Sequence, residues 1–245
     1  MTNKRTIILA MLALAAIIGY RTWDDMRLPP AGDVNALALY AEGYLISEEM
    51  PRDAIPDDNK AVTFRQGVFT GDTLARAGMK PLGFPQRQVD IVFGLDGLPG
   101  NNDAVFAQIR DVLKEWENAG NMIADVYIDY RPAAPPDWQK MEVFVRNLKE
   151  FLHAEYRIDL FMKEAWLTKE ALEGTDLLNL QKTISFYVFD IGEAPEWLDD
   201  PARFIELVDR VDFPFTVVIG KQHRSEDVFK NLRDVKFLAG YLMEI

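Results

Sequence analysis

Four carboxylates each end a run of strand-forming residues: Asp96 in VFGLD, Asp129 in VYID, Glu164 in LFMKE and Asp190 in YVFD. Because the carboxyl ends of parallel strands meet at one mouth of a barrel, we expect these side chains to surround a single opening. Two carboxyl groups that face each other can hydrolyse a glycosidic bond, one as the acid and the other as nucleophile or base. The spacing therefore favours carbohydrate chemistry.

Asp129 is the strongest candidate for the ionised catalytic carboxylate. An aspartate that follows a strand often caps a turn or the next helix, and this structural role is the alternative for each position. At Asp129 the alternative is weaker, because Asp137 is available to cap the next helix, whereas Asp96 stands in an ordinary Asp-Gly turn dipeptide. We assign Glu164 as the proton donor, and Asp96 and Asp190 as groups that position hydroxyls.

Aromatic side chains near the same strand ends are candidates for stacking on sugar rings, since aromatic rings offer large apolar faces with specific contact geometry. Packing in the core is the alternative for each of them. The candidates are Tyr130, Trp138, Trp166 and Tyr187.

Alternating strand and helix patterns place these residues. Apolar stripes predict a helix that contains Val105 to Trp116 and a second that follows Asp137 and contains Met141 to Leu152. The fold class predicted is α/β, a small (β/α)8 barrel at residues 37–245 with shortened or missing helices near its start, and the alternative is an open, doubly wound sheet of six strands. Strands are expected near 37–46, 62–69, 89–95, 124–129, 158–164, 184–190, 214–219 and 237–244.

Composition narrows the classes of ligand. The chain has 245 residues and a formal charge of -12, which argues against nucleic acid as a partner because phosphates would be repelled. Cysteine is absent, which excludes disulfides and thiolate sites, and only two histidines occur. No glycine-rich phosphate loop or calcium-loop spacing is present, so we predict neither a cofactor nor a metal. The oligomeric state is not indicated.

The N-terminal 26 residues have the pattern of an export signal. Lys4 and Arg5 precede an uncharged, mostly apolar run from Thr6 to Tyr20, and a polar linker occupies 27–36. The run has the length of a signal peptide, but the residues after it lack the small side chains of a cleavage site, which favours an uncleaved signal anchor. A cleaved signal peptide and a buried helix are the alternatives. An anchor would place the barrel outside the inner membrane, facing the periplasm or exterior.

The order of motifs is similar to that of a known group. VDIVFGLDG, ADVYIDYRPAAPPDWQKMEVFVRNLKEFL, RIDLFMKEAWL, LQKTISFYVFD and FPFTVVIG, spread over residues 88–220, resemble an uncharacterised family of exported bacterial proteins that look like glycoside-hydrolase-type (β/α)8 barrels. The resemblance implies fold and export, not a reaction. Members often carry a second acidic residue two positions after the strand-end aspartate, and here that position is Arg131.

Three functions follow as expectations. The first is a membrane-anchored glycosidase acting on a cell-envelope carbohydrate, with Asp129 and Glu164 as the catalytic pair. The second is a non-catalytic module that binds a carbohydrate or a protein on the same fold. The third is an anchored scaffold that only presents a surface. The first is the leading expectation. Arg131 weighs against it, because arginine removes one plausible half of a catalytic pair and places a cation beside Asp129, which favours the ionised form of that carboxylate.

Overall fold

The computed structural model of the chain describes residues 43–47, 49–163, 166, 179–180, 182–184, 187–190, 215–220 and 238–245. The strands are β1 (Gly43–Ile46), β2 (Ala61–Thr70), β3 (Thr73–Arg76), β4 (Gln88–Leu95), β5 (Met122–Tyr130), β6 (Arg157–Met162), β7 (Tyr187–Asp190), β8 (Phe215–Ile219) and β9 (Leu238–Glu244). The helices are the short 3-10 helix η2 (Arg52–Ala54), α3 (Asn102–Asn118) and α4 (Trp138–Phe151).

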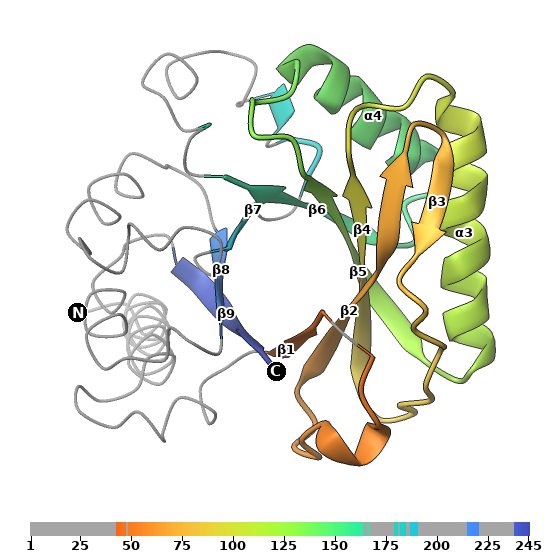
Figure 1. Cartoon of the computed structure of the whole chain (residues 1–245), viewed down its shortest axis with the longest axis vertical. Helices are drawn as coiled ribbons and strands as arrows, with labels where there is room; N and C mark the ends of the chain where they lie inside the picture. Colours follow the sequence, from red (N-terminus) through yellow and green to blue (C-terminus); the bar gives the residue numbers. More distant parts are fainter. Residues whose placement is uncertain are drawn as a thin grey trace, which may run out of the picture.

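The strands form a closed barrel. Their hydrogen-bonded order is β1-β9-β8-β7-β6-β5-β4-β2-β3, and β1 also pairs with β2. Every pairing except β2–β3 is parallel, so the eight strands other than β3 run in one direction around the ring that Figure 1 shows. The predicted eight-stranded barrel is confirmed. The open six-stranded alternative is wrong, because β1 has a partner on both edges.

β3 is an addition that the sequence pattern did not predict. It forms an antiparallel hairpin with β2, and together with residues 77–87 it stands where a helix would join β2 to β4. Gly67 of β2 has no space for a side chain, since a Cβ there would lie 2.3 Å from the Ala75 carbonyl oxygen of the hairpin. The far edge of β3 is attached to α3, because the Leu74 amide donates to Gln108.

The two long helices follow the predicted apolar stripes. Asn101 and Asp137 cap them, each accepting a hydrogen bond from a backbone amide three residues later. The stripe residues are buried against the outer faces of the strands and belong to one large core cluster. Both predicted helices are therefore confirmed, and Asp137 is the cap that the sequence assigned to α4.

Alternate residues of the strands point into the barrel. A second core cluster contains one residue from each of seven strands and fills the middle of the interior: Leu45, Val92, Tyr127, Phe161, Val188, Val218 and Leu242. This layer separates two polar regions, one at the carboxyl ends of the strands, which we call the mouth, and one nearer their amino ends.

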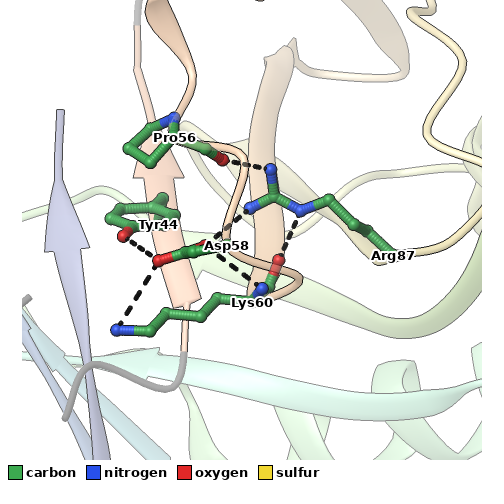
Figure 2. Close-up of polar contacts among 5 residues, drawn as sticks. All are labelled: Tyr44, Pro56, Asp58, Lys60 and Arg87. Carbon is green, nitrogen blue, oxygen red and sulfur yellow. Dashed lines mark hydrogen bonds and ion pairs between the residues drawn. The ribbon is translucent and has the colours of Figure 1, made fainter. Parts of the chain in front are cut away.

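A cluster of polar contacts joins three strands at the seam where the barrel closes (Figure 2). Arg87, immediately before β4, is almost fully buried and donates to the carbonyl oxygens of Pro56 at 2.5 Å and Lys60 at 2.7 Å. Asp58, in the loop that also contains Pro56 and Lys60, accepts a 2.5 Å hydrogen bond from the Tyr44 hydroxyl of β1. The cluster thus connects β1 and β4 to the loop that enters β2.

The N-terminal predictions lie outside the described residues. These are the signal anchor at 1–26 and the linker at 27–36. In the part of the chain that is described, none of the helices is long and apolar enough to cross a membrane.

Candidate functional site

A cavity of about 440 Å³ opens at the mouth of the barrel. Its volume lies within the roughly 300–1,000 Å³ of small-molecule sites. We call it the mouth cavity, and its lining residues come from several strands and the segments that follow them: Ser47, Arg65, Gly67, Val68, Ala77, Val92, Gly94, Asp129, Arg131, Asp190 and Glu244. The lining combines carboxylates, guanidinium groups and a hydroxyl with small residues, so it offers hydrogen bonds of both kinds to a polar ligand.

Arg65 links two of the predicted acidic strand ends. It lies in the middle of β2, and its Nη1 donates to Asp129 Oδ2 at 2.5 Å while its Nη2 donates to Asp190 Oδ2 at 3.1 Å. The guanidinium carbon lies 5.0 Å from the centre of the Phe161 ring, which belongs to the apolar layer beneath it. The side chains of all three charged residues are mostly buried. One cation therefore holds both carboxylates in ion pairs within the cavity.

Arg131 reaches the same cavity from the loop after β5. Its side chain crosses β4 at Gly94, where a Cβ would lie only 3.1 Å from Arg131 Cδ. Glycine at this position therefore gives the arginine room to lean across the strand. The structure places Arg131 on the cavity wall together with Asp129.

Asp129 and Asp190 are brought together as predicted, whereas Asp96 is not. Asp96 follows β4, is exposed, and accepts a hydrogen bond from the Thr70 hydroxyl at 3.0 Å. Its own amide donates to the Phe69 carbonyl, so the residue completes the edge between β2 and β4. It does not line the mouth cavity. Glu164, the predicted proton donor, lies outside the described residues.

The predicted stacking residues do not line the mouth cavity either. Trp166 is fully buried, donates its indole N–H to the Ala133 carbonyl, and packs against Tyr130 and Trp138 with ring centres 5.7 and 6.0 Å away. Tyr187 begins β7 instead of ending it, so it is buried at the opposite end of that strand. These four aromatics pack in the protein core or at its margin, which is the alternative that the sequence left open.

A second group of carboxylates was missed. Asp90, Asp125 and Asp159 lie near the starts of β4, β5 and β6, below the apolar layer, and at most 5% of each is exposed. We call them the base aspartates. Gln88 donates to both Asp90 and Asp125, and Arg157 donates to Asp125 at 2.5 and 2.6 Å. A recurring signal was present, because each of the three strands carries an aspartate among apolar residues near its start.

Burial and the neighbouring Asp125 charge raise the pKa of Asp90 to about 8. Asp90 therefore holds a proton at neutral pH. Among the described residues, no group of three or more His, Asp or Glu side chains is arranged to hold a metal ion. Asp90 and Asp125 are thus joined by hydrogen bonds below the mouth cavity, because Gln88 donates to both and the Asp125 amide donates to Asp90.

Comparison with known proteins identifies the fold. The catalytic domain of a family GH18 chitinase from the fern Peteris ryukyuensis superposes with a TM-score of 0.51 and 8% identity, over 82% of this chain and 91% of that one. A fungal endo-beta-N-acetylglucosaminidase of glycosyl hydrolase family 18 gives 0.53 and 12%, over 82% and 89%.

The chain has a glycoside-hydrolase-like (β/α)8 barrel fold. No protein-family model matches the sequence, and neither does any curated protein sequence. At such low identity the likeness concerns the fold alone, so the function has to be argued from the mouth cavity itself.

Proposed function

We propose that this protein is a carbohydrate-binding barrel that holds a sugar in the mouth cavity without cleaving it. The observation that carries the proposal is Arg65, whose guanidinium donates to both Asp129 and Asp190. Glycoside hydrolysis needs one carboxyl group that arrives protonated and a second that approaches the sugar. Carboxylates held by a shared cation are poorly suited to either task, but their remaining oxygen lone pairs can accept hydrogen bonds from sugar hydroxyls.

The cavity lining supports a polar, multiply hydroxylated ligand. Asp129, Asp190 and Glu244 supply acceptors, Arg131 supplies donors, and the Ser47 hydroxyl can do both. Gly67 and Gly94 leave space close to the backbone. The solved neighbours with this fold are named as carbohydrate-active enzymes, which agrees with a sugar as the ligand.

A direct test measures ligand binding and product formation separately. The full-length protein is titrated calorimetrically with a panel of neutral and acidic oligosaccharides, and each mixture is incubated and analysed for products by mass spectrometry. We expect a ligand to bind and remain intact. Asp129→Asn should weaken binding by about tenfold, because a charged acceptor is lost from the cavity. Asp111→Asn, the same change on the exposed face of α3, should bind like wild type.

Hydrolysis is the second candidate function, and Glu244 is the observation that favours it. Its carboxylate lines the same cavity and accepts a 2.8 Å hydrogen bond from the Ser47 hydroxyl. With Asp129 it would supply the second carboxyl of a catalytic pair, a role that the sequence assigned to Glu164. Products that form with wild type and disappear with Asp129→Asn would establish hydrolysis and end the binding-only proposal.

We also propose that residues 1–26 anchor the protein in the inner membrane, with the barrel on the outer side and a cell-envelope carbohydrate as its ligand. The support is Lys4 and Arg5 before the apolar run of Thr6 to Tyr20. Membrane-extracted protein should have the intact mass of the whole chain, 28.0 kDa. Loss of roughly twenty N-terminal residues would instead identify a cleaved signal peptide.

A further inference from the structure

Arg131 is a cation in the mouth cavity that forms no ion pair with any of the described residues. Its backbone is fixed, since its amide donates to the Leu95 carbonyl at 2.8 Å and its carbonyl accepts from Lys163 Nζ at 2.5 Å. Its side chain is exposed, and within the described ranges its guanidinium makes neither a hydrogen bond nor an ion pair. A fixed backbone and a guanidinium that none of the described side chains pairs with are suited to bind an anionic group on a ligand.

The contrast with Arg65 separates the roles of the two arginines. Arg65 is mostly buried and both of its terminal nitrogens donate to carboxylates of the cavity. Arg131 enters from the rim of the cavity, and the aliphatic part of its side chain packs across Gly94. Its N–H groups can therefore donate to a bound ligand. Lys163, which bonds the Arg131 carbonyl, adds a second positive charge at the same rim.

We infer that Arg131 makes the mouth cavity selective for a sugar that carries a carboxylate, such as a uronic acid or a lactyl-substituted amino sugar. This inference rests on the proposed carbohydrate-binding function and names its ligand class. A guanidinium binds a carboxylate through two parallel N–H···O bonds, which gives geometric selectivity as well as attraction. The hydroxyls of the same sugar would face Asp129, Asp190 and Ser47 in the same cavity.

The net charge of the chain limits the ligand to a few anionic groups. A formal charge of -12 repels polyanions at long range. At physiological ionic strength, however, charges more than about 8 Å apart are largely screened, so direct contacts in the cavity decide the binding of a short oligosaccharide. One carboxylate placed against Arg131 is therefore compatible with an acidic protein, whereas a long, densely charged glycan is not.

Matched disaccharides test the selectivity. Chitobiose is the neutral probe, N-acetylglucosaminyl-N-acetylmuramic acid is the same pair of rings with a lactyl carboxylate, and a glucuronate-N-acetylglucosamine disaccharide carries a uronic acid. Each is titrated into the full-length protein. We expect at least one acidic probe to bind about tenfold more tightly than chitobiose, and the two acidic probes distinguish the source of the carboxylate.

Variants then assign the effect to one side chain. Arg131→Gln should remove the preference, so that the acidic probe binds no more tightly than chitobiose does to the same variant. Arg131→Lys should keep part of the preference, because the charge stays but the two-pronged geometry is lost. Arg110→Gln, the same charge change on α3, is the control and should retain the full preference. Thermal melts confirm that each variant is folded.

Any of three results would overturn the inference. If chitobiose binds as tightly as both acidic probes, or if Arg131→Gln retains the preference, the carboxylate assignment falls while carbohydrate binding stands. If no probe binds to the folded wild-type protein, both the inference and the proposed function fall.

Discussion

Replacing Asp90 by asparagine is expected to stabilise the barrel, and increasingly so as the pH rises. Asp90 is 2% exposed, and burial together with the charge of Asp125 raises the pKa of its carboxyl group to about 8. In the unfolded chain an aspartate has a pKa of about 3.9. Between these two values the folded protein therefore binds one more proton than the unfolded chain.

The sign of the effect follows from proton linkage. Where the folded state binds more protons, the free energy of unfolding falls as pH rises, by up to about 1.4 kcal/mol per pH unit for one proton. The contribution of Asp90 is fully present below about pH 4 and is lost as the pH rises through 8. Asparagine is always neutral, and its side-chain oxygen can still accept from Gln88 and from the Asp125 amide.

Urea unfolding at several pH values measures this difference. Between pH 5 and 8 we expect the free energy of unfolding of Asp90→Asn to rise relative to wild type by about 4 kcal/mol. Asp111→Asn, on the exposed face of α3, is the matched control for removing one carboxylate from the protein. A constant difference between Asp90→Asn and wild type over this range would show that Asp90 is not protonated in the folded protein.

The barrel was predictable because the apolar residues of its helices and strands follow simple patterns in the sequence. The stripe from Val105 to Trp116 identifies α3, Asp137 marks the start of α4, and each predicted strand range overlaps a strand of the barrel. Such patterns are local, since each can be recognised within a single segment of the sequence from the spacing of its apolar residues. β3 broke the pattern because it is a hairpin return of only four residues, which leaves no helical or long alternating signal.

The contents of the barrel were harder to predict. Both faces of its strands are buried, so alternation does not show which residues point inward. In β5 the sequence singled out Asp129 at the end but not Asp125, although both lie on the inner face with Tyr127.

The partners of the inward-facing groups are also remote in sequence. Arg65 pairs with residues 64 and 125 positions later in the chain, and only the strand order and register bring them together. An arginine in the middle of an apolar strand was the one local sign that a buried anion would be found nearby.

Removing Arg65 is expected to cause a large loss of stability. In Arg65→Met the carboxylates of Asp129 and Asp190, which are mostly buried and accept from one guanidinium, would lose that cation. Breaking such a pair by deleting one partner typically costs about 3–5 kcal/mol, because an uncompensated charge remains buried. We expect a loss of this size in the free energy of unfolding, measured by urea denaturation at pH 7.

A rescue experiment separates charge from packing as the cause. Methionine keeps most of the aliphatic volume of arginine, so Arg65→Met mainly removes the cation. If the loss is electrostatic, adding Asp129→Asn and Asp190→Asn should recover most of the stability, because neutral amides do not repel each other. If it persists in the triple variant, the contact of the guanidinium with the Phe161 ring is the larger contribution. Recovery of stability in the triple variant would mean that Arg65 is needed mainly because two acidic groups are kept in the mouth cavity. This is expected where a site retains carboxylates to contact a ligand although they destabilise the fold.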